Sequence, residues 1–483
     1  MSLLFAELGV EVNVYDPSQE NVQKLLERAK NAGLSSKIKD HSGYESICKA
    51  LGTRKVFIFS VPHGDVGDKT VDGLRPFLEP GDVIVDASNE HWRNTERRQK
   101  RLEPDAIHYV GMGVSGGYQS ARHGPSMSPS GSDIGLDTVL PFLTKACARD
   151  VHGKPCIAKV GPGGSGHYVK MVHNGIEQGM MSTICEVWGI MNKCLGMDYE
   201  EVATIFEQWN DRGPLKRNFL VSIGAHICRT RDPKDGSYVL ADILDKVVQD
   251  VDETEGTGVW TCEEGARLHV PIPTIAAAHL FRVGSADAAK RMAVQRAFGS
   301  RTQPGSLQLN GEEKSRFINT LHEATVVSFF LAYIQGLHLI AKASEEQKWN
   351  INFRSVMQLW RGGCIIQSDN ITDVFDKAYA SDTVDTGNLL AHELISHELS
   401  SRYSALKDVT LRAMGVDAPV PSLSASLEYY KYMSSTDLPI QFMEAQLDYF
   451  GEHMYDLKSE TPGKPVTGKH HFEWKPARGI HET

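Results

Sequence analysis

The sequence has few of the features that mark certain classes of protein. Its eight cysteines are scattered with no CxxC pair, which argues against a zinc cluster or disulfide framework and favours a reduced, cytoplasmic setting. The formal net charge of −10 argues against nucleic acid or an anionic membrane as a partner. No apolar run approaches the roughly 18 residues that span a bilayer. With 41% hydrophobic and 23% charged residues, the composition is that of a globular protein of two to four domains.

The first 160 residues alternate apolar strands with helical patterns. The stretch 10–16 alternates like a strand, and 55–61, 82–88 and 108–114 are continuous apolar runs, with a polar helix predicted over 20–32. Such runs predict a parallel sheet covered on both faces, with ligands bound at the carboxyl ends of its strands. The residues at those ends are Asp16, Val61 with Pro62, Asn89, and the turn Ser115-Gly116-Gly117.

The chain lacks the glycine-rich loop that usually opens a dinucleotide-binding sheet. The opening "MSLLFAELG" predicts the middle of a helix that ends in a cap at Gly9, with no strand or GxGxxG loop before it. The string "GPGGSG" (161–166) follows no clear first strand and predicts a hinge instead. We therefore expect a Rossmann-type sheet whose first strand is missing. An incomplete version of a longer protein is favoured over a form that binds nucleotide poorly.

Asp16 supports two interpretations. An acidic residue that closes the second strand of a dinucleotide fold binds the adenosine ribose of NAD and repels the 2′-phosphate of NADP. Alternatively, Asp16 simply opens the turn "DPS". Both interpretations stay open at this stage.

One predicted helix carries an unusual set of polar groups. In "GHYVKMVHNGIEQGMMSTICE" (166–186), Lys170, Asn174 and Glu177 share one stripe, and His173 lies about 60° to one side of it. The stripe continues into the apolar Met181. This pattern fits either a half-buried site or a solvated face.

Beyond residue 164 the pattern becomes mainly helical. We expect long helices over 170–194, 199–209, 314–343 and 388–406, followed after about residue 457 by a polar tail rich in Pro and Gly. The predicted organisation is a coenzyme domain over 1–163, a helical substrate and dimerisation domain over 164–434, and a C-terminal tail over 435–483. The fold class is thus α/β plus all-α.

Five ordered motifs then identify a family. The strings "GVSGG", "GHYVKMVHNGIEQG", "GTGVWT" (256–261), "WRGGCIIQS" (360–368) and "DYFGEHMY" (448–455) resemble decarboxylating 6-phosphogluconate dehydrogenase over essentially the whole chain. The resemblance implies a homodimer in which the tail reaches the partner subunit. It also implies NADP- or NAD-dependent oxidation and decarboxylation of a sugar acid, 6-phosphogluconate to ribulose 5-phosphate in the pentose phosphate pathway. Asp16 favours NAD over NADP.

The resemblance assigns roles to the polar stripe. It makes Lys170 the base that takes the 3-hydroxyl proton, since a desolvated lysine can have a lowered pKa, and Glu177 the acid that protonates C1 of the enediol. His173 and Asn174 match positions that hold the substrate's hydroxyls and carboxylate.

The remaining site residues follow from the same resemblance. Ser115, Gly116 and Gly117 match the turn that receives the carboxylate, and Asn89 matches a residue between nicotinamide and substrate. His453 is retained from the substrate site, whereas Asp16, Val61 and Asn89 are expected to bind the coenzyme. No metal is expected.

The sequence departs from the family pattern around the substrate phosphate. Gln178 stands where a tyrosine is expected, Glu255 where a lysine is expected, and Val283 and Leu447 where arginines are expected, with Arg282 one place away. Loss of cations beside a phosphate weakens its binding, so an unphosphorylated aldonate is an alternative substrate. Pro62 also replaces a common lysine.

Two alternative functions stay open. One is a 3-hydroxy-acid dehydrogenase that does not decarboxylate, against which the retained Glu177 argues. The other is a non-catalytic dimeric pseudoenzyme, which the missing glycine loop favours and the intact Lys170, Asn174 and Glu177 stripe opposes.

Overall fold

The computed structural model describes residues 1–249, 256–299, 303–460 and 468–475. These residues fall into two compact units, Met1–Leu427 and Glu428–Thr483. Glu255, one of the expected changes at the phosphate site, lies outside the described residues.

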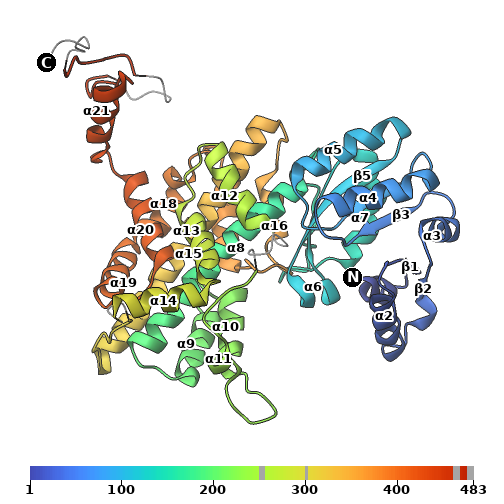
Figure 1. Cartoon of the computed structure of the whole chain (residues 1–483), viewed down its shortest axis with the longest axis horizontal. Coiled ribbons are helices and arrows are strands. Elements are labelled where there is room, and N and C mark those ends of the chain that lie inside the picture. The colour runs from blue at the N-terminus through green and yellow to red at the C-terminus, as the bar shows by residue number, and fades with distance from the viewer. Residues whose placement is uncertain (250–255, 300–302, 461–467, 476–483) are drawn as a thin grey trace. The chain divides into compact units, whose positions relative to one another are not determined.

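The first part of the larger unit alternates strands and helices, as the sequence predicts (Figure 1). Its strands are β1 (Val12–Val14), β2 (Ile38–Asp40), β3 (Val56–Phe59), β4 (Val83–Asp86), β5 (His108–Ser115) and β6 (Ser126–Ser130). Its helices are α1 (Ser2–Glu7), α2 (Gln19–Asn31), α3 (Tyr44–Leu51), α4 (Asp65–Leu74), α5 (Trp92–Leu102), α6 (Gly117–His123) and α7 (Asp133–Ala146).

The strands form two sheets. β1 and β2 pair in parallel, and a four-stranded sheet has the order β3-β4-β5-β6, parallel except for β6. Successive side chains of a strand point to opposite faces. Accordingly, Val83 and Val85 of β4 pack with α1 and α7, whereas Ile84 packs with α3, α4 and α5. Both faces of the sheet are covered, which confirms the predicted Rossmann-type architecture.

The rest of the larger unit is helical. Its elements are α8 (Ser165–Gly189) with a π-helical turn at Ile190–Cys194, α9 (Tyr199–Asp211), α10 (Phe219–Arg229), α11 (Val239–Asp242), α12 (Thr257–Arg267), α13 (Pro273–Ser285), α14 (Ala288–Phe298), α15 (Gly311–Gln347), α16 (Phe353–Leu359), α17 (Asp369–Tyr379), α18 (Glu393–Ser400) and α19 (Tyr403–Gly415). α20 (Pro421–Ser434) continues into the second unit, which also contains α21 (Ile440–Gly451).

The predicted helix over 388–406 is wrong. A short turn at Leu389–Ala391 precedes α18, and the chain breaks again before α19. Tertiary contacts explain the breaks, because the Leu389 N–H donates to His338 Nε2 and Arg402 donates to Glu323, both on α15. These contacts outweigh the local preference for one continuous helix.

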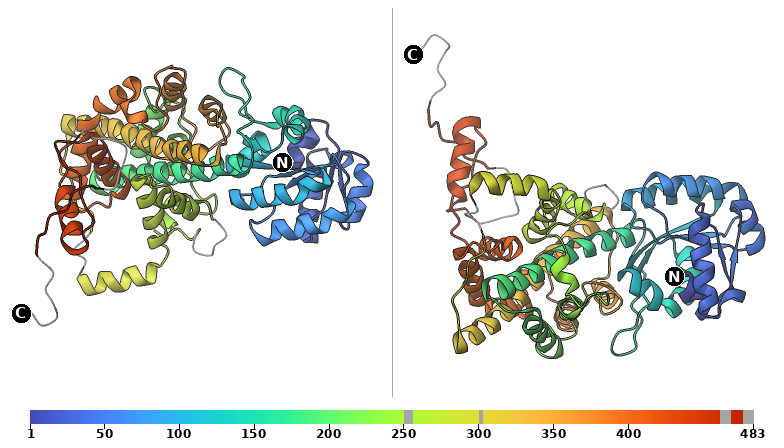
Figure 2. Two further views of the ribbon diagram at one scale, coloured as in Figure 1. Left: turned by 90° about the horizontal axis from the view of Figure 1, so that it is seen from above. Right: turned by 60° about the horizontal axis from the view of Figure 1, so that its bottom comes forward.

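α15 corrects the expectation that no segment is long and apolar enough to cross a membrane. It contains an 18-residue window of mean hydropathy 1.7, and 94% of that window is buried within the protein. It runs alongside α8, as the views in Figure 2 show. A helix that is apolar on all sides fits the core of a large domain.

Glycines let α8 lie directly on the sheet. A Cβ added to Gly166 would lie 2.1 Å from the Ser128 carbonyl oxygen of β6, and one added to Gly113 of β5 would lie 2.3 Å from the Lys170 Cβ. Larger side chains at either position would separate the two elements. The first two turns of α8 are therefore held against β5 and β6, with Lys170 beside β5.

Candidate functional site

The polar stripe of α8 is a half-buried site. Lys170 is only 8% exposed, His173 is fully buried, and the Glu177 side chain is 23% exposed. The alternative of a solvated face is wrong for this part of the helix. Lysine and histidine are rarely buried to this extent unless they are hydrogen-bonded.

The side-chain amide of Asn174 joins the members of this stripe. Its Oδ1 accepts a hydrogen bond from Lys170 Nζ at 2.7 Å and lies 3.2 Å from His173 Nδ1. Its Nδ2 donates to Thr257 Oγ1 of α12 at 2.9 Å. Because Lys170 Nζ is the donor, the amide oxygen faces Lys170, and the amide nitrogen is left to face the Thr257 hydroxyl, which can accept. Thr257 thus supports the amide that contacts both groups.

His173 is neutral with a defined tautomer. Burial and the nearby Lys170 charge hold its pKa well below the ordinary value. Its Nδ1 faces the Asn174 oxygen and lies 3.7 Å from a Glu177 carboxylate oxygen, so Nδ1 carries the proton. Its Nε2 is buried with no hydrogen-bond partner among the residues that the structure describes. That nitrogen is therefore a buried acceptor that these residues leave unused.

The predicted glycine turn lies at the end of β5. Ser115 is the last residue of β5, and Gly116 and Gly117 have φ angles of +103° and +64°. A Cβ on Gly116 would lie 2.2 Å from the Gly363 carbonyl oxygen, so both the backbone angle and the close approach require glycine there. The turn begins two residues after Gly113, which packs against Lys170. The structure therefore brings Lys170 and the turn together.

Val61 and Asn89 follow β3 and β4, which pair in parallel, so both lie at the carboxyl edge of the sheet. Both residues are half-buried, and the Val61 N–H donates to Ser88 Oγ, one residue before Asn89. The same edge is tied to α8, because His167 Nε2 donates to the Asp86 carbonyl oxygen at 3.1 Å. This bond lies one helical turn before Lys170.

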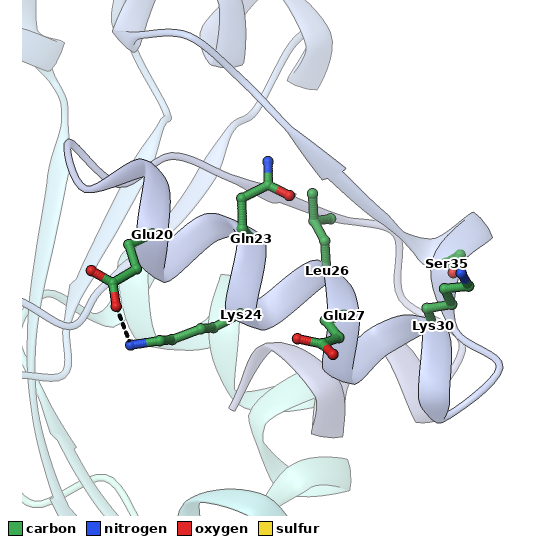
Figure 3. A pocket seen from close by; sticks show the side chains of 7 residues that line it. All are labelled: Glu20, Gln23, Lys24, Leu26, Glu27, Lys30 and Ser35. Atoms are coloured by element: carbon green, nitrogen blue, oxygen red, sulfur yellow. Dashed lines mark ion pairs between the residues drawn. The ribbon is translucent and has the colours of Figure 1, made fainter.

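Asp16 lies after β1, and its carboxylate is used within its own turn. Oδ1 accepts from the Ser18 N–H at 2.7 Å, and Oδ2 faces Asn21 Nδ2 at 3.4 Å. This is the geometry expected of a residue that opens the "DPS" turn. Figure 3 shows a nearby surface hollow on α2, where Glu20 and Lys24 form a 2.6 Å ion pair, but no predicted site residue lines it.

The altered positions of the phosphate site lie in different elements. Gln178 of α8 is buried and accepts from His279 Nδ1 of α13 at 3.1 Å, so an amide and an imidazole pair there. Val283 is exposed on α13. Leu447 and His453 belong to the second unit, where Leu447 lies on α21 and His453 contacts the Phe450 ring.

Sequence reasoning missed two supporting residues. Thr257 lies in the quoted "GTG" motif but was assigned no role, and its contact with Asn174 crosses 83 residues. His167 precedes Lys170 by three residues, and its Nδ1 contacts Thr95 Oγ1 of α5 at 2.7 Å. The i, i+3 spacing of His167 and Lys170 was the available signal, since it places both on one side of α8.

Comparison with known proteins identifies the family of the chain. Residues 1–161 match the family model for the NAD binding domain of 6-phosphogluconate dehydrogenase, and residues 166–474 match its C-terminal domain. The chain is 42% identical to decarboxylating 6-phosphogluconate dehydrogenase of Emericella nidulans, over 99% of both chains. It is 35% identical to the enzyme named decarboxylating 1 of Spinacia oleracea, over 98% of this chain and 95% of that one.

A solved structure extends the match to three dimensions. The Plasmodium falciparum 6-phosphogluconate dehydrogenase, described with its cofactor NADP+ and its substrate 6-phosphogluconate, matches with a TM-score of 0.87 and 32% identity. The match covers 98% of this chain and 97% of that one. Fold and site together define a nicotinamide-dependent oxidoreductase with a Rossmann-type domain and a large helical domain. The chain belongs to the decarboxylating 6-phosphogluconate dehydrogenase family, as the five sequence motifs predicted.

Proposed function

We propose that this protein catalyses the NADP-dependent oxidative decarboxylation of a six-carbon 3-hydroxy sugar acid, as its relatives' names describe for 6-phosphogluconate. The observation that carries the proposal is the buried cluster of Lys170, His173 and Asn174, held beside the turn at the end of β5. A scaffold protein has no need for an amine and an imidazole in that position, because burying polar groups costs free energy.

The coenzyme fits the edge of the sheet. β3 and β4 place Val61 and Asn89 side by side at their carboxyl ends, where Rossmann-type sheets bind nucleotides. When bound there, the coenzyme accepts a hydride from C3 of the substrate. A coenzyme at this edge would lie close to Lys170, because the His167–Asp86 hydrogen bond holds α8 against the end of β4.

Lys170 and Glu177 supply the proton transfers. A neutral Lys170 amine accepts the 3-hydroxyl proton as the hydride leaves C3, giving a 3-keto acid. That acid loses carbon dioxide, because the ketone takes up the electron pair of the broken C1–C2 bond, and the Lys170 ammonium returns its proton to that oxygen to give an enediol. Glu177, two turns along the helix, then donates a proton to the carbon that carried the carboxylate, while the Lys170 amine takes back the enediol hydroxyl proton. The remaining acceptor of His173, Nε2, takes a hydrogen bond from a substrate hydroxyl.

The choice of NADP rests on two observations. The matched Plasmodium structure is described with NADP+, and a relative from Bacillus subtilis is named NADP(+)-dependent. In addition, the Asp16 carboxylate accepts hydrogen bonds from its own turn. The sequence-based preference for NAD is tested by comparing kcat/KM for the two coenzymes in the parent protein and in Asp16→Ala.

A second candidate substrate is an unphosphorylated aldonate. The buried Gln178–His279 pair is consistent with it, because the Gln178 amide is neutral and lacks the charge-assisted donors with which arginine or lysine holds a phosphate. The ratio of kcat/KM for 6-phosphogluconate to that for gluconate decides between the candidates. A ratio above about 10³ supports the phosphorylated substrate, since charge-assisted contacts to a phosphate are worth several kcal/mol in total.

The second unit supports a homodimer. Large apolar side chains of α21 are exposed, including Phe442, Met443 and Phe450, and a stable monomer rarely exposes so many together. We propose that residues 435–483 pack on a second copy of the chain and bring His453 to the partner's site. Sedimentation of the whole chain and of a version ending at residue 434 tests this: loss of the dimer in the shorter chain is expected.

A cytoplasmic location is also proposed. All eight cysteines are free, as expected in a reducing compartment. Some plant relatives are named chloroplastic. Cell fractionation distinguishes the two locations.

The defining experiment is an assay of both products. The protein with NADP+ and sugar acid should form reduced coenzyme and carbon dioxide in equal amounts. Reduced coenzyme without carbon dioxide would support the 3-hydroxy-acid dehydrogenase alternative, and neither product would support the pseudoenzyme.

A further inference from the structure

A fully buried arginine lies beneath the edge of the sheet where coenzyme and substrate are expected to meet. Arg98 of α5 has no exposed surface, and its guanidinium is surrounded by acceptors. Nη1 donates to Glu90 at 2.7 Å and to Asp86 at 3.3 Å, Nε donates to Asp68 at 3.1 Å, and Nη2 donates to the Gly64 carbonyl oxygen at 2.7 Å. One cation thus holds three carboxylates and one backbone oxygen.

Two of these acceptors, Gly64 and Glu90, lie in the loops that carry Val61 and Asn89, and Asp86 directly precedes the second loop. Asp86 is the last residue of β4, and its Oδ1 accepts from the Ser88 N–H, while Ser88 Oγ accepts from the Val61 N–H. Glu90 directly follows Asn89. Arg98 therefore determines the backbone on both sides of Asn89 and, through Ser88, the end of β3.

Glu90 has no spare acceptor capacity. One oxygen accepts from Arg98 and from the Gly64 N–H, and the other accepts from the His91 N–H and from Asn94 Nδ2. An ionised carboxylate can accept at both oxygens, whereas a glutamine amide would direct an N–H toward two of these donors. The loop after β4 therefore depends on a carboxylate at this position.

The same network extends to α8. Tyr109 of β5 donates to Asp86 at 2.5 Å, and the Asp86 carbonyl oxygen accepts from His167 of α8. Asp86 thus connects the arginine beneath the strand ends with the turn of α8 that precedes Lys170. A displaced guanidinium would shift the Asn89 loop relative to Lys170.

We propose that Arg98 is a positioning residue for hydride transfer: its guanidinium sets Asn89 and Val61, and hence the nicotinamide end of the coenzyme, relative to the substrate carbon beside Lys170. This inference rests on the proposed function. The planar fork of arginine is required, because a lysine ammonium cannot reach acceptors on four sides at once.

The test compares Arg98→Lys with Arg97→Lys in the full-length protein. Arg97 is its neighbour and also binds Asp68, at 2.7 Å, but its side chain is 52% exposed. We expect Arg98→Lys to raise KM for NADP+ and to lower kcat about 10- to 100-fold, because displacement of reacting groups by about 1 Å costs up to 10²-fold. Arg97→Lys should stay within about twofold of the parent, as exposed pairs contribute little.

Two readouts separate positioning from a merely structural role. A smaller folded fraction lowers apparent kcat but leaves KM and the deuterium isotope effect at C3 unchanged. Misplacement should instead raise both, because hydride transfer becomes the slow step. Parent-like KM and isotope effect in folded Arg98→Lys would overturn the proposal.

Glu90→Gln provides a second variant with the same expected changes if Arg98→Lys does not fold. If neither variant folds, Arg98 is a folding determinant and the proposal fails. Failure of the parent protein to oxidise any sugar acid would instead count against the proposed function, and binding of NADP+ by the variants would still report on the Asn89 loop.

Discussion

Two carboxylates of α8, Glu177 and Glu186, lie in different surroundings. In the first half, Glu177 has a partly exposed side chain near His173. In the second half, the buried Glu186 accepts from the Ser422 and Leu423 N–H groups at the start of α20 and from Ser182 Oγ. Nine residues separate them, which places them on opposite faces of the helix.

Under the proposed function, one helix carries both a reactive carboxylate and a structural one. Glu186 faces donors on a helix N-terminus, where a carboxylate is stabilising, and these donors occupy both of its oxygens. Glu177 lies beside the polar cluster on the opposite face and keeps access to solvent. Both burial and hydrogen-bond partners therefore distinguish the two carboxylates.

The largest expected effect is at the reactive face. Lys170→Met keeps the length of the side chain and removes the amine, so oxidation should fall by about 10³-fold through loss of the general base. Lys193→Met is the matched control, because Lys193 is exposed in the turn that follows α8 and should leave turnover unchanged. Initial rates of coenzyme reduction measure both. Equal rates in the parent and Lys170→Met would disprove the base assignment.

Exchange of each carboxylate for an amide sharpens the comparison. Glu177→Gln should lower product formation about 10²-fold, because an amide cannot donate the final proton, while unfolding stays unchanged. Glu186→Gln should do the reverse and cost about 1–3 kcal/mol of stability, since an amide N–H would face the Ser422 and Leu423 donors. Rates and urea unfolding of both variants measure this, and matching profiles would contradict the division of roles.

Substitution of one glycine near each end of α8 compares how closely the two ends are packed. Gly166→Ala should destabilise by about 1–3 kcal/mol, because its Cβ would lie 2.1 Å from the Ser128 carbonyl oxygen. Gly189→Ala should stabilise by about 0.5–1 kcal/mol, because it is helical with no atom within 4 Å of an added Cβ. Thermal unfolding measures both, and a stabilised Gly166→Ala would show that α8 does not contact β6 so closely.

A pH dependence of stability is expected for Glu186, the structural one of the two carboxylates. Burial raises its pKa to about 7 from an ordinary value of 4.5, although its backbone N–H donors oppose the shift. The folded state then binds the extra proton, so the contribution of this group is greatest below pH 4.5 and is lost as pH rises toward 7. From pH 5 to 7 the free energy of unfolding should fall by about 2 kcal/mol.

The matched measurement is the same pH series on Glu186→Gln, which lacks this titration. The difference in unfolding free energy between the two proteins should change across pH 5–7. A constant difference would show that the Ser422 and Leu423 donors keep the carboxylate ionised throughout that range.

Much of the fold could be predicted because the signals were local. The apolar runs that became β3, β4 and β5 and the periodic pattern of α8 depend only on residues close in sequence. The break before α18 could not be predicted from the sequence, because it depends on a contact with His338, which is distant in the sequence. The 18-residue apolar window of α15 likewise is explained only by the helices that cover it.

The candidate site was likewise predictable only where its signals were local in the sequence. The helical period placed Lys170, Asn174 and Glu177 on one stripe, but it could not reveal that the Asn174 amide contacts Thr257, 83 residues away in the sequence. The buried Arg98 could not be predicted for a similar reason, because its three carboxylates come from a helix, a strand and a loop.

The most direct test of the central claim measures reduced coenzyme and carbon dioxide together, in the parent protein and in Lys170→Met, with NADP+ and either 6-phosphogluconate or gluconate. The expected result is one carbon dioxide per reduced coenzyme in the parent, with both products lost together when the amine at position 170 is removed. A folded parent protein that yields neither product from either acid, or a Lys170→Met protein that yields both at the parental rate, would contradict the account.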